Sequence, residues 1–88
     1  MRTWKIYGHF RQSVHELAER PTADDRWIAD LQKLVQGFEA DTASLEAISA
    51  AILRERLCAQ LEEEAVQAGC THRRTVLLGA VKFLESAR

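Results

Sequence analysis

The chain contains few of the residues that make tight turns or covalent cross-links. There are four glycines, one proline and two cysteines among 88 residues. A small β-sandwich or barrel needs many tight turns, which glycine and proline favour, so their scarcity argues against that fold class. Two cysteines are too few for a disulfide scaffold.

Long apolar runs and an excess of one charge are also lacking. The longest uncharged, mostly apolar run is Thr75 to Val81, far shorter than the ~20 residues of a membrane-spanning helix. Lysine and arginine (12) nearly balance aspartate and glutamate (13), so the formal net charge is −1. We therefore expect no membrane partner, and this balance argues against a generally basic nucleic-acid coat. Polar residues from His9 onward interrupt any apolar stretch behind Arg2 and Lys5, so we expect no signal peptide.

The residues that are present are typical of a small globular domain. An apolar share of 47% is too high for a disordered chain, and 88 residues suffice for one domain. The two cysteines, Cys58 and Cys70, fall roughly 18 Å apart along a helix that rises 1.5 Å per residue, beyond the ~7 Å between Cα atoms that a disulfide allows. We therefore expect reduced thiols in a cytoplasmic protein. An intermolecular disulfide through Cys70 is the alternative.

The spacing of the apolar residues predicts an all-α fold, a four-helix bundle-like domain with a long third helix. We expect helices at about residues 4–20, 23–40, 44–68 and 72–87. In the first, the apolar residues between Ile6 and Ala18 recur every three or four residues, within an arc of about 120°. Tryptophan, isoleucine and tyrosine also favour strands, so a short strand over Thr3–Tyr7 is the competing interpretation.

Several expected helix ends carry sequence signals. Pro21 should end the first helix, because the residue before a proline is pushed out of the α region. Thr22 is placed to cap the second helix, and Asp24 and Asp25 favour the positive end of its dipole. Gly69 is well placed as the C-terminal cap of the third helix.

The third expected helix has apolar residues on two opposite sides. Leu45, Ile48 and Ile52 cluster on one side, whereas the apolar residues from Leu53 to Ala68 lie about 170° away. Either the helix bends near Leu53, or one straight helix buries its two halves against different neighbours. The straight helix is favoured, because the sequence near Leu53 has no glycine, proline or cap residue to cause a kink.

Association with a second copy is the expected way to bury these faces. The third helix would reach ~36 Å, longer than its neighbours easily cover, and the apolar arc of the fourth helix is about 160° wide. Small domains often complete their cores by association, so we expect a homodimer. Six residues are expected to form the dimer or partner face: Leu53, Leu57, Leu61, Leu77, Val81 and Leu84. The alternative is a closed monomeric four-helix bundle.

No spacing of residues supports catalysis or metal binding. The segment from His15 to Glu19 nearly matches the zinc-protease motif, but a glutamate occupies the second histidine position, and a catalytic zinc needs three protein ligands. Cys70 and His72 form a two-ligand fragment, with Cys58 too distant to join it. The basic residues beside Cys70 favour its thiolate, yet no partner for thiol catalysis is identifiable. We therefore expect no catalytic, cofactor-binding or metal-binding residue, and a protein that is not an enzyme.

Charges of opposite sign flank the expected turn at Gly69. Glu62–Glu64 lie near the negative end of the third helix, and His72, Arg73 and Arg74 near the positive end of the fourth, so each cluster is unfavourable for its own helix dipole. The favoured interpretation is that the two clusters neutralise each other as ion pairs. In the other interpretation, the three basic residues and the free N–H groups of the fourth helix contact an anion or a nucleic acid.

The segment from Leu61 to Leu84 resembles the helix–turn–helix part of ribbon-helix-helix repressors. Those repressors read DNA with a short strand before the helix pair, whereas the residues before Leu57 have a helical pattern, so we do not assign the chain to that family. We expect a non-enzymatic interaction or accessory protein that binds itself and an unidentified protein through apolar helix faces. The alternative is a small dimeric DNA-binding regulator that uses the basic start of its last helix.

Overall fold

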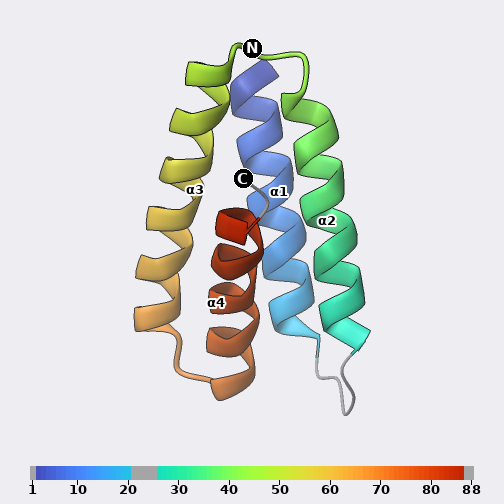
Figure 1. Cartoon of the computed structure of the whole chain (residues 1–88). Coiled ribbons are helices and arrows are strands. Elements are labelled where there is room, and N and C mark those ends of the chain that lie inside the picture. Colours follow the sequence, from blue (N-terminus) through green and yellow to red (C-terminus); the bar gives the residue numbers. More distant parts are fainter. Residues whose placement is uncertain (1, 21–25, 87–88) are drawn as a thin grey trace.

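Helices account for nearly all of the chain that the structure describes (Figure 1). The structure is a computed structural model, which describes residues 2–20 and 26–86, and no strand occurs in these two ranges. The helices are α1 (Arg2–Glu19), α2 (Arg26–Thr42), α3 (Ala47–Gln67) and α4 (Thr71–Ser86). The all-α prediction is therefore confirmed, and the competing strand over Thr3–Tyr7 is wrong because α1 contains it.

The four helices pack side by side in alternating directions. α1 and α3 begin at the end of the bundle where the N-terminus lies, whereas α2 and α4 run the opposite way (Figure 1). α4 lies between its neighbours and contacts α1, α2 and α3, while α2 and α3 lie on opposite sides of the bundle. α4 has 16 residues against 21 in α3, so it covers only the half of α3 next to the turn that joins them (Figure 1).

One core runs through the centre of the bundle. The apolar stripes of all four helices supply it, and the rings of Phe10 and Phe38 meet there with centroids 5.2 Å apart. Seven large side chains are almost completely buried in it: Val14, Leu31, Leu57, Leu61, Val76, Leu77 and Leu84. The core is therefore closed within a single chain.

The residues expected to face a second copy belong to this core. All six have exposed fractions of 6% or less: Leu53, Leu57, Leu61, Leu77, Val81 and Leu84. The cause is that α4 folds back along α3 in the same chain, so that the two helices cover each other's apolar stripes. The expectation needs correction, because these six side chains are unavailable as a surface in this fold.

α3 is one continuous helix, as the straight-helix interpretation has it. The straight-helix interpretation also expected the first half of α3 to be buried against a neighbouring helix. Ile48 and Ile52 in that half are instead 72% and 47% exposed. Only Leu45, just before the helix, is half-buried. The reason is that α2 lies across the bundle, so no described helix covers the outer side of α3 (Figure 1).

The turn between α3 and α4 differs from the expected one. α3 ends at Gln67, and Ala68 is extended, with φ −68° and ψ 128°. No described glycine has a positive φ, so Gly69 is not the left-handed cap expected there. The Arg74 side chain instead donates to the carbonyl oxygens of Ala65 and Ala68, at 3.4 and 3.2 Å. The end signals expected at Pro21, Thr22, Asp24 and Asp25 lie outside the described residues.

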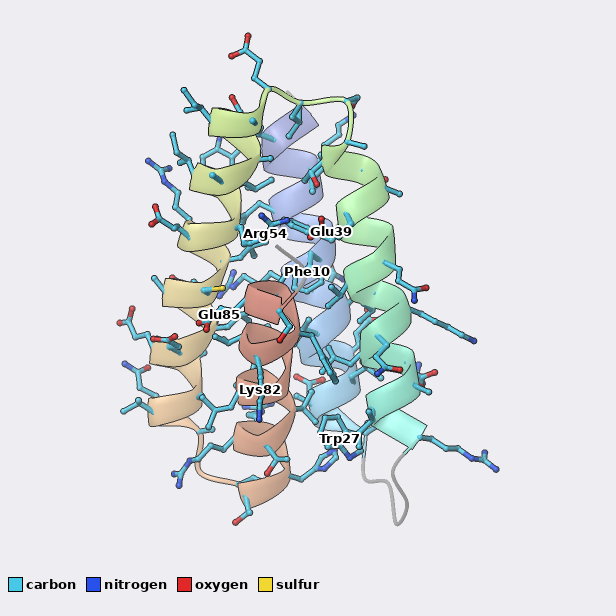
Figure 2. The ribbon with its side chains drawn as sticks, in the orientation of Figure 1. Phe10, Trp27, Glu39, Arg54, Lys82 and Glu85 are labelled. Atoms are coloured by element: carbon cyan, nitrogen blue, oxygen red, sulfur yellow. The ribbon has the colours of Figure 1, made fainter. Side chains whose placement is uncertain are left out.

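An ion pair joins α2 to α3 in the half of the bundle that α4 does not reach (Figure 2). The Arg54 guanidinium lies 2.5 Å from the Glu39 carboxylate, and its central carbon is 6.0 Å from the centroid of the Phe38 ring. The Arg54 side chain is only 13% exposed. The ion pair thus lies beside the Phe38 ring in the part of the bundle that α4 does not reach.

Candidate functional site

The basic start of α4 is directed toward other parts of the chain. Arg73 donates to the Glu19 carboxylate at the end of α1, at 3.3 Å, and Arg74 is bound to the last carbonyls of α3. The Nε2 atom of His72 is buried, without a hydrogen-bond partner among the described residues. The three side chains therefore do not converge on a common anion site.

The acidic cluster has different partners from those expected. Glu64 accepts hydrogen bonds from the Nε atom of Arg11 at 2.9 Å and from the side-chain amide of Gln60 at 3.2 Å, and its other oxygen lies 2.8 Å from Nε2 of His15. The expected pairing of this cluster with the basic residues across the turn is wrong for Glu64, because that carboxylate points from α3 toward α1. Its neighbours Glu62 and Glu63 are exposed.

The contacts of Glu64 change its acidity. Burial raises the pKa of the Glu64 carboxyl, but the hydrogen bonds from Arg11, Gln60 and His15 together outweigh burial and hold this pKa below its usual value. The hydrogen bond between Arg11 and Glu64 also raises the pKa of the Arg11 guanidinium. This cluster is an electrostatic link between two parallel helices, α1 and α3.

Cys70 immediately precedes α4, where a side chain accepts hydrogen bonds from the first backbone N–H groups. The backbone N–H groups of Arg73 and His72, together with the charge of Arg73, lower the pKa of its thiol. Cys70 is exposed, whereas Cys58 is half-buried on α3. The chemistry available at Cys70 is that of a thiol with more thiolate at neutral pH than an ordinary cysteine has.

The described residues contain no group of three or more histidine, cysteine or acidic side chains placed to hold a metal ion. His15, part of the near-match to the zinc-protease motif, has its Nε2 atom 2.8 Å from the carboxylate of Glu64 on α3. Within the part of the chain that the structure describes, no helix is both long enough and apolar enough to cross a membrane.

Several large apolar side chains of α1 and α3 are exposed. Trp4 is 69% exposed, and on α3 the exposed fractions are 72% for Ile48, 47% for Ile52 and 79% for Val66. A shallow cavity of about 210 Å³ lies between the two helices, lined by Thr3, Trp4, Tyr7, Leu53 and Arg56. The ring of Trp4 meets that of Tyr7 edge to face, with centroids 6.2 Å apart.

The exposed apolar residues of α3 share a narrow sector with two charged ones. At 100° per residue, six side chains lie within about 40° of Ile52 around the helix, and we call them the α3 outer face: Ile48, Ile52, Arg56, Ala59, Glu63 and Val66. Sequence reasoning missed this face because it grouped Ile48 and Ile52 with Leu45 as buried residues. The seven-residue spacing of Ile52, Ala59 and Val66 is the signal that could have found it.

Within residues 2–20 and 26–86, the protein is a bundle of four helices, and none of the described helices covers the outer face of α3. A comparison with models of known families, with curated proteins and with solved structures finds no match.

Proposed function

We propose that this chain is a small non-enzymatic interaction or accessory protein of the cytoplasm, which docks onto other proteins through the outer side of α1 and α3. The observation that carries the proposal is the exposure there of Trp4, Ile48, Ile52 and Val66. An exposed apolar patch rimmed by polar residues is typical of a protein interaction site. Tryptophan is among the residue types that are enriched where binding energy concentrates.

A homodimer, as expected from the sequence, is part of this proposal, but its interface consists of other residues than those first expected. Leu57, Leu61 and Leu84 are used inside one chain, so a second copy is not needed to complete the core. Self-association has to use exposed side chains instead, and the apolar ones on α3 are Ile48, Ile52 and Val66.

The proposal is tested by replacing two exposed residues and following the proteins that the chain retains from its host. The double variant Ile48→Ser/Ile52→Ser should lose a specific partner that the unmodified chain retains. Leu78→Ser is the matched control, because Leu78 is 46% exposed on α4, away from this surface. Circular dichroism should show equal helicity in all three proteins. The proposal fails if no protein is retained, or if the double variant and the control retain the same ones.

The DNA-binding alternative has less support. Its basic residues already have partners within the chain, Glu19 for Arg73 and the end of α3 for Arg74. Salt-dependent binding to a DNA duplex, lost in Arg73→Glu/Arg74→Glu, would favour it. Absence of binding at low salt, where phosphate contacts are strongest, would eliminate it.

A further inference from the structure

The α3 outer face has two unlike halves. The half nearer the start of α3 contains the large apolar side chains Ile48 and Ile52, followed by the cation of Arg56. The other half contains the small Ala59, the anion of Glu63 and the apolar Val66. Each half has what the other lacks, in charge and in size. A face of this kind is complementary to itself when a second copy is turned end to end.

We propose that two copies of this chain associate through antiparallel packing of their α3 outer faces, on a two-fold axis near Ala59. Residues at equal distances from Ala59 on either side then meet across the axis. Ile52 and Val66 are each seven residues from Ala59, so each isoleucine packs on the partner's valine. Ala59 has the smallest side chain of the face and allows the two helices to approach closely at the axis.

Charge complementarity selects the antiparallel direction. Arg56 and Glu63 are three and four residues from Ala59 on opposite sides, so antiparallel packing sets each guanidinium near the partner's carboxylate, and the pair occurs twice. A parallel pair would set Arg56 against Arg56 and Glu63 against Glu63. Two other exposed acids, Glu55 and Glu62, lie about 60–80° around the helix from Ile52, at the rim of the face. Glu62 is as far from Ala59 as Arg56 is, so it adds a second carboxylate on the side of the partner's guanidinium. Glu55 is as far from Ala59 as Glu63 is, and its rim position keeps this pair of like charges in solvent.

The α3 outer face extends along a helix at the edge of the bundle. α3 has 21 residues, which is about 30 Å of helix, and it lies at the edge of the bundle with its outer side uncovered by the described helices (Figure 1). Trp4 and the cavity beside Arg56 widen this surface toward α1.

The inference rests on the proposed function and is tested by charge exchange. Light scattering after size exclusion, from about 5 to 200 µM, should show a dimer for the unmodified chain. Arg56→Glu and Glu63→Arg should each weaken dimerisation at least tenfold, because each sets like charges against each other across the axis. The double variant Arg56→Glu/Glu63→Arg should regain most of the affinity. Glu16→Arg, a charge reversal on the side of α1 that faces α2, should change it less than threefold.

Two outcomes overturn the inference. One is an unmodified chain that stays monomeric at 200 µM; if Ile48→Ser/Ile52→Ser then still loses a specific host partner, the proposed function stands and the occupant of the face is another protein. The other is a dimer that the single charge reversals weaken but the double variant does not recover, or that none of them weakens. Equal helicity by circular dichroism in all variants shows that lost association is not lost folding.

Discussion

Single side chains hold neighbouring helices of this bundle in place. Glu64 on α3 is the clearest case, because it is bound at once by Arg11 and His15 of α1 and by Gln60 of its own helix. A carboxylate with three such contacts is stabilised in its charged form. Its contribution to folding therefore depends on pH.

Replacing Glu64 by glutamine should lower the free energy of unfolding by about 1 kcal/mol at pH 7. The pKa of Glu64 lies below its usual 4.5 in the folded chain. The stabilisation is thus complete above the unfolded-state pKa and is lost as the pH falls through the folded-state pKa. Urea unfolding should give different stabilities for the two proteins at pH 7 and similar ones near pH 2. A difference as large near pH 2 as at pH 7 would contradict this account. Glu16→Gln, at an exposed acid of α1, is the control.

Cys70 should be the more reactive of the two cysteines. Its thiol pKa is lowered by the backbone N–H groups of Arg73 and His72, so more thiolate is present at neutral pH in the folded chain than in the unfolded one. The alkylation rate with iodoacetamide should therefore rise at lower pH in buffer than in urea, with peptide mass spectrometry separating Cys70 from Cys58. Arg73→Gln removes one of the positive charges near the thiol, so it should reduce the difference between the pH profiles in buffer and in urea. Identical pH profiles in buffer and urea would show that the helix start does not act on this thiol.

Close packing at a glycine positions α4 against α2. Gly79 is the glycine of the chain where an added Cβ would meet atoms of another helix within 4 Å. A Cβ added at Gly79 of α4 would lie 3.1 Å from Cζ3 of Trp27 and 3.3 Å from Cδ2 of Leu31, both on α2. Trp27 lies beside α4 in Figure 2 as well. The absence of a side chain at Gly79 thus sets how closely α4 approaches α2.

Gly79→Val should destabilise the chain by about 1–3 kcal/mol, because its methyl groups force Trp27 and Leu31 out of place. Gly37 of α2 offers a matched control, since nothing lies within 4 Å of a Cβ added there. Gly37→Val should change the stability by about 0.5 kcal/mol or less, because valine has only a slightly higher helix propensity than glycine. Thermal unfolding measures both. Equal shifts of Tm in one direction would mean that helix propensity, not the α2–α4 contact, decides the effect at Gly79.

Across the whole molecule, buried and exposed apolar residues occur on the same helix. Leu61 is fully buried, whereas Ile52 on the same helix is 47% exposed. Leu61→Ala should lower the free energy of unfolding by about 2–5 kcal/mol. Ile52→Ser, at a partly exposed position, should change the stability of the single chain by about 0.5 kcal/mol or less.

Urea unfolding at 1 µM, a concentration chosen to favour the single chain, measures both effects. Repeating it at 100 µM adds any contribution from association, which should be visible in the unmodified chain and in Leu61→Ala but reduced in Ile52→Ser. A large loss of stability in Ile52→Ser at 1 µM would mean that this residue belongs to the core.

The amphipathic spacing alone determined the four helices and most of the core. The stripes of α1, α2 and α4 are local properties, because apolar residues at three- and four-residue intervals must share a helix face that needs burial. Phe10 and Val14 could be placed in the core on that basis, and both are buried. Leu84 was also expected to be buried, but against a second copy rather than inside the single chain. The continuity of α3 also followed from local chemistry, since no residue near Leu53 causes a kink.

The tertiary structure decided which faces are covered and which charges meet. Ile48 and Leu57 are equally apolar in the sequence, but α4 folds back over only one side of α3, so one is exposed and the other buried. Glu64 binds α1 rather than the basic start of α4, because its direction around α3 selects its partner. The scarcity of glycine, proline and cysteine excluded turn-rich and disulfide-linked folds at the outset. It could not show that the bundle closes within one chain and leaves the outer face of α3 uncovered, since this depends on contacts between segments far apart in sequence.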